Sequence, residues 1–178
     1  ELPSRYLPSL ATQRARQMKL PDRATLDVAL ADASSDLPFR QDLFAPFVDD
    51  RTRLLILGSL PGEEALRQQR YDAFPGNQFW RLVGAVIECD LVALDYDARM
   101  AGLRRAGIGL WDVIGSAKRE GSLDAAIREH SPNALRELVA ELPGLRAVGF
   151  NGGTSSRLGR TILEGAGLEG GPALVSLP

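Results

Sequence analysis

The sequence is poor in the residues from which disulfide bonds and metal centres are built. Its 178 residues contain one cysteine, Cys89, and one histidine, His130. A disulfide framework, a zinc site made of cysteine and histidine, and a four-cysteine iron–sulfur cluster are therefore excluded within this chain. We expect neither a metal nor another cofactor.

Long apolar runs and an excess of positive charge are also missing. No apolar stretch approaches the roughly 20 residues that a helix needs to cross a bilayer, and the N-terminal region lacks the pattern of a signal peptide. The net charge is −2, so the composition has no global basic signature of nucleic-acid binding, although a local groove lined with arginine would not alter the sum. We expect a soluble intracellular protein, cytoplasmic and monomeric, without a membrane partner.

The apolar content is sufficient for one folded core. Apolar residues make up 44% and charged residues 25% of the chain, which favours a single globular domain over disorder. Residues 1–42 contain four prolines between modest helical stretches such as 22–33, and we interpret them as an N-terminal extension of unknown role. Residues 43–178 form the expected α/β domain.

Short runs of branched aliphatic residues alternate with amphipathic stretches in this domain. The pattern predicts strands at 51–57, 108–114, 146–150 and 173–177, and helices at 63–69, 77–87, 97–105, 124–129, 133–141 and 154–163. Strands that alternate with helices over this length call for a parallel sheet between helices. The expected fold is α/β, a three-layer α/β/α sandwich around a central four-stranded parallel sheet.

The most informative stretch spans residues 53–80. An apolar strand breaks into GSLPG at 58–62, and YDAFPGNQFW follows at 71–80. The glycines let the backbone leave the strand sharply, and in open α/β sheets ligands bind at that end of the strands. We therefore interpret both segments as the lining of an active site.

Several segments together carry a family resemblance: GSLPG and YDAFPGNQFW, then GIGLWDV at 107–113, REGSLD at 119–124 and FNGGT at 150–154. Their order and spacing resemble the uracil-DNA glycosylase superfamily, and most closely its hypoxanthine-DNA and mismatch-specific (G/T, G/U) glycosylase branches. The resemblance implies a monofunctional DNA glycosylase that hydrolyses the N-glycosidic bond of a deaminated base, hypoxanthine or uracil, in base-excision repair. It also implies that relatives continue beyond residue 178 into a closing loop and a helix, which we expect this domain to lack.

Two polar residues are the catalytic candidates. Hydrolysis of an N-glycosidic bond needs a directed water, and the Asn77 carboxamide can both accept and donate hydrogen bonds; the resemblance implies catalysis by the aligned Asn. The alternative is that Asn77 only caps the following helix. Ser59 lies where other branches carry Asn or Asp, and we expect it to hydrogen-bond a base or a water.

A second group is expected to bind the extruded nucleotide. Tyr71, Phe74 and Phe79 are candidates for stacking on the base. The resemblance places Asp112 where several branches read the base edge, and the alternative is a loop or capping residue. We assign Phe79 and Trp80 to the core. The remaining candidates are the turn residues Gly58, Leu60, Pro61 and Gly62, whose backbone would face a leaving-group oxygen or a phosphate.

A third group is expected to contact the DNA backbone, and it comprises Ser116, Lys118, Arg119, Asn151, Gly152 and Gly153. A Schiff-base role for Lys118, which would make a bifunctional lyase, needs a desolvated pocket, and its charged neighbours indicate a solvated loop.

Two departures from the relatives keep other functions open. Asp72 stands where relatives carry a second aromatic residue, and Phe74 stands where they carry histidine. The alternative is a non-catalytic protein that binds nucleic acid or nucleotides on the same fold. A small-molecule hydrolase that uses Ser59 would need a general base that the sequence does not offer.

Overall fold

The computed structural model describes residues 44–74, 76–164 and 170–177, which all fall within one compact unit. In this part of the chain, the main sheet consists of β1 (Leu54–Gly58), β2 (Ile108–Asp112), β5 (Ala147–Asn151) and β6 (Ala173–Leu177). The strand order is β2-β1-β5-β6 and every neighbouring pair is parallel. The predicted four-stranded parallel sheet is confirmed, whereas the extension over 1–42 and its helix at 22–33 lie outside the described residues.

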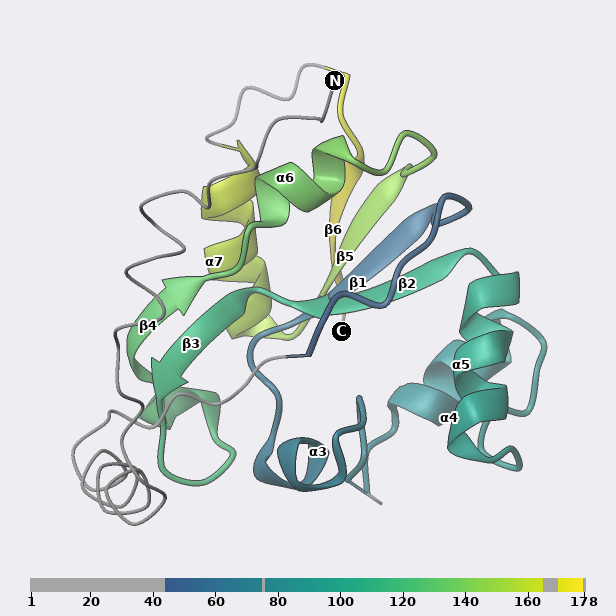
Figure 1. Cartoon of the computed structure of the whole chain (residues 1–178), viewed down its shortest axis with the longest axis horizontal. Coiled ribbons are helices and arrows are strands. Elements are labelled where there is room, and N and C mark those ends of the chain that lie inside the picture. The colour runs from purple at the N-terminus through teal and green to yellow at the C-terminus, as the bar shows by residue number, and fades with distance from the viewer. Residues whose placement is uncertain (1–43, 75, 165–169, 178) are drawn as a thin grey trace, which may run out of the picture. The chain divides into compact units, whose positions relative to one another are not determined.

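Helices cover both faces of this sheet (Figure 1). On one side lie α4 (Phe79–Val86) and α5 (Tyr96–Arg105), and on the other lie α6 (Leu135–Ala140) and α7 (Gly153–Glu164). The short helix α3 (Glu63–Gln68) follows the carboxyl end of β1. The predicted three-layer α/β/α architecture is thus confirmed.

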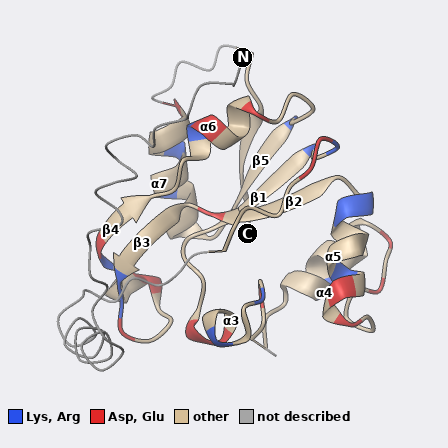
Figure 2. Ribbon diagram, viewed as in Figure 1, with Lys and Arg blue, Asp and Glu red and all other residues tan. Residues whose placement is uncertain are grey.

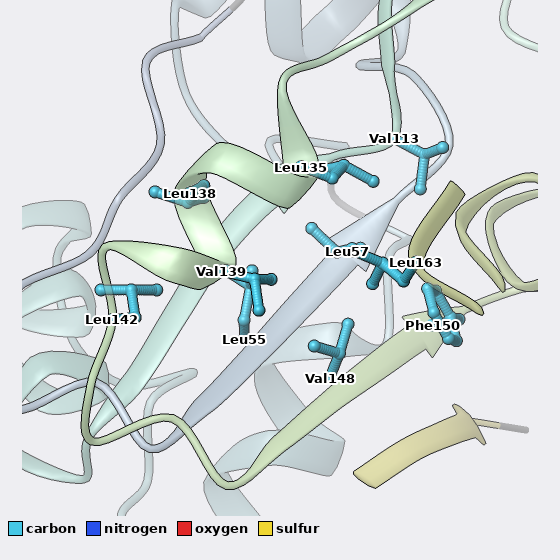
Figure 3. Close-up of a cluster of buried hydrophobic side chains, with 10 residues drawn as sticks. All are labelled: Leu55, Leu57, Val113, Leu135, Leu138, Val139, Leu142, Val148, Phe150 and Leu163. Atoms are coloured by element: carbon cyan, nitrogen blue, oxygen red, sulfur yellow. The ribbon is translucent and has the colours of Figure 1, made fainter. Parts of the chain in front are cut away.

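The sheet buries side chains on both faces because its strands alternate. On β1, Leu55 and Leu57 belong to the core under α6 and α7, and Ile56 between them belongs to the core under α4 and α5. Figure 3 shows the first of these cores, where β1 and β5 meet α6 and α7: Leu55, Leu57, Val113, Leu135, Leu138, Val139, Leu142, Val148, Phe150 and Leu163. A sheet packed on both faces gives its loops a rigid base.

A two-stranded antiparallel sheet was not predicted. The expected strand at 108–114 ends at Asp112, and a separate strand β3 (Ile114–Lys118) pairs with β4 (Arg128–Pro132). The helix predicted at 124–129 is wrong: a single 3₁₀ turn, η1 (Asp124–Ala126), leads into β4. All five residues of β4 are exposed, so the strand forms by pairing with β3 and not through an apolar pattern of its own.

Charged side chains of both signs are interspersed along the described ribbon (Figure 2). No helix among the described residues is long and apolar enough to cross a membrane.

Candidate active site

A pocket of about 430 Å³ opens where β1 and β2 end. The last residues of these strands, Gly58 and Asp112, are register partners. The pocket walls come from segments 58–65 and 71–79, joined by residues from elsewhere in the chain: Phe44, Leu110, Trp111, Ser122 and Asn151. The structure thus brings the two segments that the sequence singled out to one cavity at the carboxyl edge of the sheet, where parallel sheets bind ligands.

Asn77 is held at the pocket wall by both ends of its carboxamide. Its Oδ1 accepts a hydrogen bond from the backbone N–H of Phe79 at 2.9 Å, and its Nδ2 donates to Oδ1 of Asp72. The contact to Phe79 gives the N–H of the first residue of α4 a side-chain acceptor, although Gln78 occupies the N-cap position, so Asn77 supports the start of the helix. It does not exclude catalysis, because a carboxamide keeps a second acceptor site and a second donor hydrogen for a substrate or a water.

Asp112 places a carboxylate in the pocket beside that amide. The residue is 7% exposed, and no described side chain or backbone group donates a hydrogen bond to its carboxylate. Burial, and after it the negative charge of Asp72, raise the pKa of Asp112 to about 7, while the positive charge of Arg119 acts in the opposite direction. The carboxylate lines the pocket, where it can accept a hydrogen bond from a ligand.

Asp72 is the second carboxylate of the pocket. Burial raises the pKa of Asp72 to about 6, and the hydrogen bond from Asn77 lowers it in part. The backbone at Asp72 adopts φ 50°, and its carbonyl oxygen accepts from the indole N–H of Trp80 at 3.1 Å. The loop before α4 therefore turns the Asp72 side chain toward Asn77.

Ser59 is engaged with a neighbour at the rim. Its hydroxyl donates to Oδ1 of Asp124 at 2.7 Å, and the hydroxyl of Ser122 accepts from the backbone N–H of Glu63 at 3.0 Å. These two contacts tie the segment 119–124 to the turn at 58–62. Ser59 lines the pocket as expected, but its hydrogen bond to Asp124 favours a role in holding the turn.

The turn at 58–62 is also held by contacts with β3 and with Arg119. Leu60 is buried against Ile114 and Ala117 of β3, and Pro61 is buried beside it. Arg119 was expected to contact phosphate, but the structure places it differently: it is 7% exposed and its guanidinium donates to the carbonyl oxygens of Leu60 and Pro61. Arg119 therefore supports the turn, and its contact with phosphate stays a prediction.

The aromatic residues divide between wall and core. Tyr71 is half-buried, its ring lies edge-on against Phe44 at 4.8 Å between centroids, and its hydroxyl donates to the carbonyl of Ala45 at 3.0 Å. Phe74 is 64% exposed beside the pocket, which suits stacking on an incoming base. Phe79 and Trp80 are 7% and 5% exposed, which confirms their assignment to the core.

The other residues expected at the DNA backbone lie outside the pocket, with the exception of Asn151. Ser116 and Lys118 lie on β3, where Lys118 forms a solvent-exposed ion pair with Glu129 at 2.6 Å. Exposed pairs of this kind contribute little, so the ammonium remains free to exchange Glu129 for a phosphate. Gly152 precedes α7 with φ 102°, and Gly153 is the first residue of that helix.

The sequence did not predict three contributors to this site. They are the carboxylate of Asp72, Phe44 as part of the pocket wall, and Asp124 as the hydrogen-bond partner of Ser59. Asp72 carried a usable signal, since it stands five positions before Asn77 in a glycine- and proline-containing loop. The other two come from distant parts of the chain and have no local signature. Within the described residues, no three His, Cys, Asp or Glu side chains lie close enough to hold a metal ion.

Comparison with known proteins gives a consistent result. The model of the uracil DNA glycosylase superfamily matches residues 45–174. A hypoxanthine DNA glycosylase from Methanosarcina barkeri is 43% identical over 126 residues, which cover 71% of this chain and 79% of the relative. A hypoxanthine DNA glycosylase from Methanosarcina acetivorans is 40% identical over 126 residues with the same coverage.

A solved structure also resembles the fold. It is the solution NMR structure of a Methanosarcina acetivorans protein provisionally named a uracil DNA glycosylase. The two structures superpose with a TM-score of 0.69 at 37% sequence identity, and the match covers 79% of this chain and 84% of the other.

Proposed function

Because the chain belongs to the uracil DNA glycosylase superfamily, we propose that it is a monofunctional DNA glycosylase that removes hypoxanthine or uracil from DNA. The reaction hydrolyses the bond between the deaminated base and C1′ of its deoxyribose, and it leaves an abasic site. The protein acts as a monomer and uses no cofactor in this proposal.

One observation carries the proposal: a carboxamide fixed by two hydrogen bonds and the buried carboxylate of Asp112 line the same pocket. The Asn77 amide is oriented by Asp72 and by the N–H of Phe79, and Asp112, the last residue of β2, lines the same pocket. A glycosylase needs a group that directs water at the sugar and a group that recognises the base. The pocket supplies both from different elements of a rigid fold.

The chemistry follows from these two groups. The C1′–N bond breaks with its electron pair leaving on the base, and the sugar gains oxocarbenium character. The free acceptor site on Oδ1 of Asn77 orients a water toward C1′, and the developing positive charge lies near the acidic side of the pocket. Electrostatic stabilisation of this kind is commonly the largest contribution to catalysis.

Asp112 explains a preference for deaminated bases. Deamination converts the ring nitrogen of adenine or cytosine that faces its pairing partner from an acceptor into an N–H donor. An ionised carboxylate accepts a hydrogen bond from that N–H, whereas it repels the lone pair of the undamaged base. Binding of the N–H also favours the ionised form of Asp112.

We expect Asp112→Ala to change base selection and not DNA affinity. Loss of a hydrogen bond to a charged group costs about 1.5–3 kcal/mol, which corresponds to a rate of hypoxanthine release lower by on the order of 10- to 100-fold. The ratio of hypoxanthine to uracil release should shift, because a purine and a pyrimidine reach the carboxylate to different extents. Single-turnover rates on matched duplexes and the Kd for DNA measure the two effects separately.

Asp112→Asn is the matched control for this experiment. Its carboxamide has nearly the same size but also carries a donor, so it tolerates the acceptor nitrogen of an undamaged base. Discrimination against adenine and cytosine should therefore weaken in Asp112→Asn. An unchanged base preference in both variants would remove Asp112 from base recognition.

The proposal is tested by base release. The chain is incubated with end-labelled duplexes that contain a single hypoxanthine or uracil, and half of each sample is then treated with alkali. Strand cleavage only after alkali is the expected result, because it reports an abasic site without lyase activity. Cleavage without alkali would indicate a Schiff base such as one on Lys118, and salt-dependent DNA binding without base release would indicate the non-catalytic binding protein.

A further inference from the structure

We propose that Asp72 is a catalytic residue of this chain, whose carboxylate accepts a proton from the water that Asn77 orients toward the sugar. The inference rests on the proposed function and goes beyond it, because it names the residue that accepts the proton of the attacking water. That residue stands at a position where the relatives carry an aromatic side chain.

The geometry around Asp72 supports this role. Its Oδ1 accepts from Nδ2 of Asn77, which leaves Oδ2 for another donor in the pocket that both residues line. The proposed step requires that the water held by Oδ1 of Asn77 also reaches this second carboxylate oxygen in the same pocket. Among the described residues, Asn77 supplies the only hydrogen bond to the Asp72 carboxylate, so no cation neutralises it directly.

The backbone holds Asp72 in place for this task. Its φ of 50° is a left-handed conformation that Asp and Asn adopt more readily than most residues. The indole N–H of Trp80, which is in the core, donates to the Asp72 carbonyl. A strained conformation that is held by a core side chain is a common feature of functional loops.

The proton balance of the step is complete. One O–H bond of the water breaks and its proton goes to the Asp72 carboxylate, while the water oxygen forms a bond to C1′. The C1′–N bond breaks, and its electron pair leaves on the base, which takes a proton from solvent. Asp72 then returns its proton to solvent, so no further reactant is needed.

The pKa of Asp72, raised by burial to about 6, suits a general base near neutral pH. The titratable and charged side chains that line the two cavities at Asp72 are Asp112 of β2, Glu64 of α3, Asp95 at the start of α5, Tyr96 and Arg99 of α5, and Arg70 and Tyr71 of its own loop. Arg70 and Arg99 lie over aromatic rings, at 5.0 Å from Tyr96 and 5.3 Å from Trp80. The negative charge of Asp72 raises the pKa of Asp112, and also those of Tyr71 and Tyr96.

Asp72→Asn separates proton transfer from positioning. An asparagine at position 72 still accepts from Nδ2 of Asn77 and tolerates the same φ, but it cannot take a proton. We expect the single-turnover rate to fall by on the order of 10²- to 10⁴-fold, with unchanged DNA affinity. Asp97→Asn, at an exposed site on α5, is the matched control and should keep the wild-type rate.

The pH dependence gives a second readout. If both Asp72 and Asp112 act as carboxylates, the wild-type rate rises with pH through their pKa values of about 6 and 7, and it depends on the loss of two protons. In Asp72→Asn, the rate should depend on one proton only, and the remaining midpoint should move to lower pH because the charge that raises the pKa of Asp112 is gone. Carboxyl NMR titration of Asp112 in both proteins measures this shift without any substrate.

Asp72→Gly provides a chemical rescue. Glycine adopts φ 50° without strain and leaves space for a small carboxylate. Added formate should restore part of the lost rate in Asp72→Gly and none in Asp72→Asn. The inference is overturned if Asp72→Asn keeps the wild-type rate and pH profile, or if Asp72→Gly is slow and formate has no effect. Absence of base release by the wild-type chain would instead overturn the proposed function, and this inference with it.

Discussion

Asn77→Ala is expected to lower the rate of base release by on the order of 10²- to 10³-fold, the range found when one group that stabilises a transition state is removed. The variant loses the acceptor that orients the water and the donor that holds Asp72. It should bind DNA as tightly as the wild type, because the residues predicted to contact phosphate lie on other elements. Single-turnover base release and a binding titration on the same hypoxanthine duplex test both statements.

Asn77→Ser distinguishes catalysis from capping. Serine is also a preferred capping residue, so it keeps a hydrogen bond to the N–H of Phe79, whereas alanine loses about 1 kcal/mol of stability there. We expect Asn77→Ser to recover the thermal stability that Asn77→Ala loses and to remain as slow in base release. Equal activity of Asn77→Ser and the wild type would reduce Asn77 to a helix cap.

The main sheet was predictable because burial on both faces leaves a strong local signal. Runs such as 54–57 and 147–150 are short, apolar and bounded by turns, which is typical of central parallel strands. The predicted strand at 173–177 coincides with β6, and the predicted helices at 63–69 and 97–105 each differ from α3 and α5 by one residue. Ligands bind at the carboxyl ends of the strands in such a sheet, so the residues that end these strands could be predicted to line the pocket.

The features that the sequence did not predict depend on contacts between segments that are distant in the chain. β4 has only exposed residues and forms because β3 offers it backbone partners, so its sequence reads as a loop or a helix. Burial raises the pKa of both Asp72 and Asp112, and the charge of Asp72 raises the pKa of Asp112 further, although 40 positions separate them in the chain. The family resemblance made Asp72 look like a lost aromatic residue, whereas the structure shows a carboxylate that accepts a hydrogen bond from the Asn77 amide.

Gly58→Ala is expected to damage base recognition through Asp112. A Cβ at position 58 would lie 2.5 Å from Oδ1 of Asp112, which is closer than real Cβ contacts allow. The two residues are register partners at the ends of β1 and β2, so the backbone cannot move apart without breaking the sheet. The carboxylate must therefore rotate away from its position, at an overpacking cost of about 1–3 kcal/mol.

The rate of hypoxanthine release by Gly58→Ala should fall by on the order of 10- to 100-fold, as for loss of the hydrogen bond from the base to Asp112. Gly144→Ala is the matched control, because its Cβ would meet only backbone oxygens at 3.6 Å, far from the pocket residues. The decisive comparison is a double-mutant cycle: in an Asp112→Ala background, the clash is absent and Gly58→Ala should cause no further loss. Additive losses would mean that Gly58 affects the pocket independently of Asp112. They would refute the proposal that the absence of a side chain at Gly58 allows the Asp112 carboxylate to keep its position.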